Sequence, residues 1–176
     1  MHGKRGWPFR MPKEAGAVII DTPAALSQRE ITELTYYADC ILVPVLPSAF
    51  DVHVTTNFIA ELLLLTDFDR PIAVIANRTR KNTRSLARLM QTLNNIETPT
   101  IAVLRDCQNF VRAADLGVGI YEMPHHEVKQ EIEQFDLIIN WLDRQLMRTL
   151  EPGLISRFNA LPRLFASSRT GLSHAD

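Results

Sequence analysis

Asp21 is the first residue in the chain whose type and position suggest chemistry. It directly follows four apolar residues, 17–20, and Pro23 turns the chain two residues later. Such an apolar run predicts a strand buried on both faces of a parallel sheet. Ligands of open α/β sheets gather at the carboxyl ends of strands, where this carboxylate could hold Mg²⁺ on a nucleotide, directly or through water. The alternative is a strand that simply ends at an Asx turn.

Basic side chains form the second group that could take part in binding. The densest cluster consists of Arg78, Arg80, Lys81, Arg84 and Arg88. Arg84 and Arg88 share the outer face of an expected helix, so the cluster could bind the phosphates of DNA, and Arg112 could extend it. The alternative is a solvated helix face.

Composition limits the classes of function. The chain has 176 residues, 46% of them hydrophobic and 22% charged, which is typical of one globular domain. A net charge of −1 gives no overall attraction to nucleic acid, so any such contact must be a local patch. Cys40 and Cys107 lie far apart without a Cys/His cluster, which argues against a zinc site or a disulfide framework and fits a cytoplasmic protein. The run of four leucines at 62–65 is far too short to cross a bilayer.

Apolar strands alternate with amphipathic helices along the chain. This alternation predicts an α/β fold, a doubly wound and mostly parallel sheet with flanking helices. The expected strands are 17–21, 40–45, 71–76 and 100–104, and the expected helices are about 28–38, 52–66, 83–93, 109–115 and 127–146. Pro44 is expected to end the pairing of the second strand, because proline lacks a backbone donor.

Helical spacing predicts which side chains face the core. In the second helix these are Val54, Phe58, Leu62 and Leu65, and in the last helix Val128, Ile132, Phe135, Ile139, Leu142 and Leu146. We expect three regions: an irregular lead-in (1–16), an α/β domain (17–147) and a loosely ordered tail (148–176).

Four segments together resemble the ParA/MinD-type P-loop ATPases, the deviant Walker A family, and ParA-like members in particular. Residues 18–23 (VIIDTP) resemble the Walker B strand, and residues 38–48 (ADCILVPVLPS) are similar to the family's "AD…PV.PS" segment. Residues 75–78 (IANR) match the Asn-Arg strand end beside the adenine, and residues 113–122 (AADLGVGIYE) match the stretch before the closing helix. The resemblance spans about 17–146.

The resemblance implies roles for single residues. Asp21 would order water around Mg²⁺. Asn77 and Arg78 would line the base pocket, with Arg105 near it. Ser48 and Asp51 would belong to the loop that responds to nucleotide and shapes the dimer face; Ser48 could equally be the N-terminal signal of the next helix.

The resemblance also implies ATP and Mg²⁺ as cofactors, and a homodimer, non-specific DNA and an adaptor or activator protein as partners. The function would be the partition or positioning of plasmids, chromosomes or other cargo.

The sequence departs from this family in one respect. We find no Gly-rich Lys-containing loop, the Walker A element that holds the phosphates, so we expect an incomplete P-loop NTPase fold. We therefore do not expect this chain alone to hydrolyse ATP, and we assign no catalytic residue. By analogy, the absent strand would lie beside the Walker B strand. Either an upstream segment supplies it, or the remaining strands pair without it, or a partner chain provides it. The alternative function is that of a nucleotide-free remnant that acts as a protein- or DNA-binding module.

Overall fold

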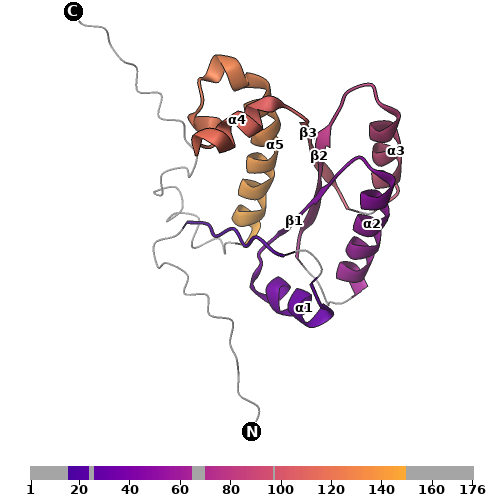
Figure 1. Cartoon of the computed structure of the whole chain (residues 1–176). Coiled ribbons are helices and arrows are strands. Elements are labelled where there is room, and N and C mark those ends of the chain that lie inside the picture. Colours follow the sequence, from indigo (N-terminus) through magenta and orange to yellow (C-terminus); the bar gives the residue numbers. More distant parts are fainter. Residues whose placement is uncertain (1–15, 24–25, 65–69, 97, 150–176) are drawn as a thin grey trace, which may run out of the picture.

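Strands and helices alternate along the described part of the protein (Figure 1). The computed structural model describes residues 16–23, 26–64, 70–96 and 98–149. Its elements, in chain order, are α1 (Gln28–Tyr37), β1 (Ile41–Val45), α2 (Ala49–Leu64), β2 (Ile72–Thr79), α3 (Arg84–Leu93), β3 (Thr100–Arg105), α4 (Gln108–Leu116), the short 3-10 helix η1 (Ile120–Glu122) and α5 (His125–Thr149).

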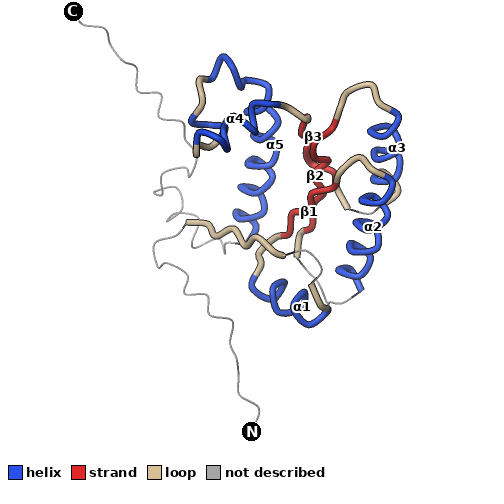
Figure 2. Tube along the Cα trace, viewed as in Figure 1, coloured by secondary structure: helices blue, strands red, loops and turns tan. Residues whose placement is uncertain are grey.

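The three strands form one parallel sheet in the order β1-β2-β3. In the register, Val43 lies opposite Val74, and Thr79 at the end of β2 lies opposite Arg105 at the end of β3. Figure 2 shows the strands between α5 on one side and α2 and α3 on the other. The expected α/β class is therefore confirmed, with three strands in the described residues.

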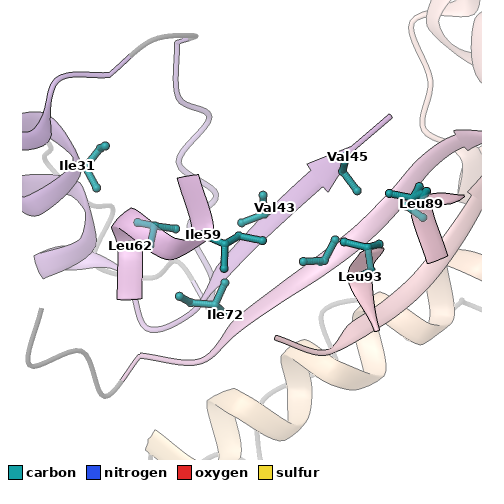
Figure 3. Packing of buried hydrophobic residues seen from close by; sticks show 10 residues of the cluster. Ile31, Val43, Val45, Ile59, Leu62, Ile72, Leu89 and Leu93 are labelled. Carbon is teal, nitrogen blue, oxygen red and sulfur yellow. The ribbon is translucent and has the colours of Figure 1, made fainter. Parts of the chain in front are cut away.

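Each face of the sheet is covered by its own apolar cluster. On one face, Val43 and Val74 pack against Ile31 of α1, Ile59 of α2 and Leu89 of α3 (Figure 3). On the other face, a smaller cluster joins Ile75, Ala102 and Leu104 to Ile138 of α5. Apolar strand residues that alternate between two helical layers explain why the strands read as continuous hydrophobic runs.

The strand expected at 17–21 does not form. Residues 17–23 have no regular structure, Val18 is 46% exposed and Ile19 is 91% exposed. An apolar run becomes a strand only when a neighbour satisfies its backbone hydrogen bonds, and no described strand pairs with this segment. The expectation of four strands side by side is therefore wrong for the described residues.

Strand pairing continues past Pro44, contrary to expectation. Pro44 lies opposite Ile75, and Val45 opposite Ala76. The N–H of Ile41 donates to the carbonyl oxygen of Pro71, which leads into β2. Since backbone groups alternate between the two sides of a strand, the nitrogen of Pro44 points away from β2, where it interrupts no hydrogen bond of this pair.

Helix α2 begins three residues earlier than expected, and its core-facing side chains agree with the expected ones only in part. Ile59 and Leu62 are buried and Phe58 is partly buried, whereas Val54 is exposed. Apolar residues occur on all sides of the helix, mixed with polar ones such as Asp51 and Glu61, so spacing alone did not select the buried face. Leu65 lies outside the described residues.

The buried stripe of α5 also differs from the expected one. Val128 is buried as expected, but Ile132, Phe135, Ile139, Leu142 and Leu146 are only partly buried. Glu131, Ile138, Trp141 and Gln145 are buried in addition. The helix is thus rotated so that two polar residues join its packed face.

The other helices agree with the sequence pattern to within a few residues at each end. Helix α1 begins after Ser27, whose side chain and the side chain of Glu30 form a capping box. The expectations for 1–15 and 150–176 lie outside the described residues. Within the described ranges, no helix combines the length and apolar character that a membrane crossing requires.

Candidate functional site

The carboxyl ends of β2 and β3 meet at one edge of the sheet. The hydroxyl of Thr79 donates to the carbonyl oxygen of Leu104 over 3.0 Å, and the N–H of Asp106 donates to the carbonyl oxygen of Thr79 over 2.8 Å. These two bonds fix the residues after β2 against those after β3. The structure thus brings Asn77 and Arg78 to the same edge as Arg105, as the sequence predicts.

The backbone of Arg78 is left-handed, with φ of 50°. This conformation is uncommon for a residue with a side chain, and it lies where the register between β2 and β3 shifts. The Asn77 side chain supports it, because its Oδ1 accepts the Arg78 N–H over 2.9 Å. Asn77 thus supports the irregular backbone near the end of β2, and its place in a base pocket stays a prediction.

Asp106 binds two of the predicted basic residues. Its Oδ2 accepts from Nε and Nη2 of Arg80 over 3.2 and 2.9 Å, and its Oδ1 lies 3.6 Å from Nε of Arg78. The hydrogen bonds from Arg80 lower the pKa of Asp106 below its ordinary value, and the charge of Arg78 acts in the same direction. Two positive charges are thus partly neutralised.

Arg105 is held by α5. Its Nε and Nη2 donate to Oε1 of Glu131, the first over 2.6 Å, and its Nη1 donates to Oε1 of Gln130 over 2.6 Å. Its backbone N–H donates to Oε1 of Gln134 over 3.1 Å. The guanidinium group expected beside a nucleotide therefore binds a helix of its own chain.

Glu131 is fully buried, and the sequence analysis did not identify it. Burial opposes its ionisation, but hydrogen bonds from Cys107 and Arg105 outweigh this effect and hold its pKa below the ordinary value. The available signal was its position, three residues after Val128 and four before Phe135 in an apolar stripe. A lone carboxylate within such a stripe indicates a buried partner of opposite charge.

Lys81, Arg84 and Arg88 are exposed, and we call them the α3 basic surface. In the described ranges no ion pair joins any of them to a carboxylate. Thr83 caps α3 by accepting the N–H of Leu86 over 3.3 Å, and no acidic residue lies in the first turn. The positive end of the helix dipole therefore carries additional cations instead of the usual anions.

Arg112 does not extend this surface as a free cation. It forms an ion pair with Glu127 at the start of α5. Asn109 also contacts that residue, donating from Nδ2 to the carbonyl oxygen of Glu127 over 3.0 Å. The two contacts fasten α4 to α5.

Ser48 and Asp51 cap the start of α2. Oγ of Ser48 accepts the N–H of Asp51 over 3.1 Å and donates to Oδ2 of the same residue. The interpretation of Ser48 as a helix start signal is confirmed. Their role in a nucleotide-responsive loop stays a prediction.

The segment that carries Asp21 does not reach the carboxyl edge of the sheet. Figure 1 draws the segment 16–23, in indigo, near the yellow end of α5, away from the loops that follow β2 and β3. Among the described residues, no three His, Cys, Asp or Glu side chains gather as a metal site. Asp21 as placed here could hold Mg²⁺ only with water or with oxygen atoms of a bound nucleotide.

No protein-family model matches the chain, and no curated protein matches it. The ParA-like assignment therefore depends on the four sequence segments alone.

Proposed function

We propose that this protein is a ParA-like partition or positioning protein of the cytoplasm, and that its described part is a DNA-binding module. The α3 basic surface carries the proposal. Lys81, Arg84 and Arg88 are exposed and have no acidic partner among the described residues, whereas the nearby arginines are paired with carboxylates. Unpaired cations on one surface are what a polyanion requires.

The position of these cations favours phosphate as the ligand. Arg84 lies in the first turn of α3, where a positive side chain opposes the helix dipole and costs about 0.3–1 kcal/mol of stability. A phosphate at the same end relieves that repulsion, because it meets both the side-chain charges and the positive end of the helix. Arg84 and Arg88 are one turn apart, which suits contacts to a phosphate backbone.

The test is a salt titration of binding to duplex DNA, read by fluorescence anisotropy. Each phosphate contact contributes about 0.9 to the slope of log K against log salt. The double variant Arg84→Gln, Arg88→Gln should therefore reduce the slope by about 2 for any DNA sequence. Arg144→Gln with Arg148→Gln on α5 removes the same charge at the same spacing and should leave the slope unchanged. An unchanged slope in the α3 variant would reject the α3 basic surface as the DNA contact.

A second candidate is nucleotide binding at the carboxyl edge of the sheet. The meeting of β2 and β3, with Asn77 and Arg78 near the end of β2, favours it, and ATP with Mg²⁺ would be the ligands. Asp21 would reach this metal only if segment 16–23 moved to the carboxyl edge. The Arg105 contacts count against it, because this side chain must leave Glu131 to reach a nucleotide. Calorimetry with ATP and Mg²⁺ separates the candidates: the module proposal expects no heat, and micromolar binding that Asp21→Ala abolishes would favour the nucleotide site.

The family's homodimer and its adaptor or activator protein belong to the same proposal. Neither is needed for the salt titration, which tests the α3 basic surface in a single chain.

A further inference from the structure

Two unmatched β-type features occur in the described part of this chain. Strand β1 is an edge strand, since the order of the sheet is β1-β2-β3. Segment 17–21 carries Val18, Ile19 and Ile20 in sequence, yet it pairs with no described strand. The outer edge of β1 offers unpaired backbone groups. Segment 17–21 offers exposed apolar residues and has the same length as β1.

The outer side of β1 can still form hydrogen bonds. Because Ile41 faces β2, the alternation along the strand turns the N–H and carbonyl of Leu42 outward, together with the carbonyl of Pro44. Pro44 removes one donor from this side. An added strand would therefore bond to the first half of β1 through both kinds of group and to the second half through carbonyl oxygen alone.

Large apolar side chains flank β1 at both ends. Tyr36, at the end of α1, is 76% exposed, and Phe50, at the start of α2, is 77% exposed. Leu46, directly after the strand, is also exposed. Exposed apolar groups around an open strand edge indicate an interaction surface.

We infer that two copies of this chain associate by reciprocal strand exchange, with segment 17–21 of each copy lying parallel to β1 of the other. Segment 17–21 is the strand that we expect to pair with the outer edge of β1, because it exposes β-forming residues and pairs with no described strand. In this structure it lies on the α5 side of the sheet and does not pair with its own β1 (Figure 1). The exchange would bury Ile19 and extend each sheet by one strand. It is independent of DNA binding through the α3 basic surface.

The first test is the oligomeric state of the full chain, measured by sedimentation velocity over a wide concentration range. We expect a reversible dimer, weakened at least tenfold by Ile19→Lys. Because Ile19 is 91% exposed, this substitution leaves the monomer folded, and circular dichroism checks that. Leu116→Lys, at a 62% exposed position on α4, is the matched control and should leave the dimer unchanged. A monomer at all concentrations, or a dimer that Ile19→Lys leaves intact, would overturn the inference.

The second test locates the contact. Parallel docking brings residue 17 of one copy near Cys40, which directly precedes β1 of the other. Ala17→Cys in a Cys107→Ser background should be cross-linked to Cys40 by a short bismaleimide, and adding Cys40→Ser should abolish the product. Mixing chains of two lengths identifies a product between copies, which supports exchange. A product within one chain would show that the segment docks on its own β1, and would overturn it.

Discussion

Nε of Arg105 lies 2.6 Å from Oε1 of Glu131, and the Glu131 side chain has no exposed surface. The two residues are 26 positions apart in the chain, on β3 and α5. This ion pair and the bond from Arg105 to Gln130 join the end of the sheet to its covering helix. The same contacts occupy the arginine that the family resemblance assigns to a nucleotide.

Removing one member of this pair should be costly. Arg105→Met leaves a buried carboxylate without its cation, so we expect a loss of about 3 kcal/mol in the free energy of unfolding. Adding Glu131→Leu should restore most of it, since an apolar pair needs no compensating charge. Urea unfolding of the wild type, both single variants and the double variant measures the coupling. A loss below about 0.5 kcal/mol in Arg105→Met would contradict the role of the pair.

Stability should decline in acid. The pKa of Glu131 is lowered from its ordinary value of 4.5, and that of Asp106 is lowered as well, so the folded chain binds these protons less readily than the unfolded chain. Their contribution is complete above the ordinary carboxyl pKa and is lost as pH falls from there through the lowered pKa. Urea unfolding between pH 6 and 3, taken at about half-unit steps, should show the decline. It should be shallower in Arg105→Met, and equal declines in both proteins would count against this assignment.

The cap of α2 should contribute to stability. Ser48→Ala removes the acceptor of the Asp51 N–H, and we expect a loss of about 1 kcal/mol. Ser48→Asp keeps an acceptor at the same place and should lose less. Thermal unfolding compares the two variants. If Ser48→Ala is neutral, the hydroxyl does not act as a cap, and the loop role implied by the family becomes the better explanation of this residue.

Gly117 should resist replacement for conformational reasons. It ends α4 with φ of 68°, and a Cβ added there would meet no atom within 4 Å. Any cost of Gly117→Ala therefore comes from the left-handed backbone, and we expect about 1 kcal/mol. Gly117→Asn should lose less, because asparagine tolerates this conformation better. Equal losses in urea unfolding would argue against the conformational explanation.

The sequence by itself determined the type and order of most elements. The β-branched strands 41–45, 72–79 and 100–105 and the amphipathic helices between them carry local patterns, and these survive in the structure with shifts of a few residues. Capping is local as well, so Ser48 was recognisable as a helix start. Asn77 and Arg105 could be placed at one edge because parallel strands share a direction.

Only the tertiary structure decided which strands pair, which helix faces are buried and which charged side chains contact each other. Segment 17–21 has the composition of a buried strand, but a strand depends on hydrogen bonds from a neighbour that no local pattern specifies. The buried faces of α2 and α5 were also undetermined, because a helix with apolar residues on several sides can pack in more than one rotation. Glu131 shows the same limit: whether Arg105 faces a ligand or a carboxylate of its own chain depends on contacts between residues far apart in sequence.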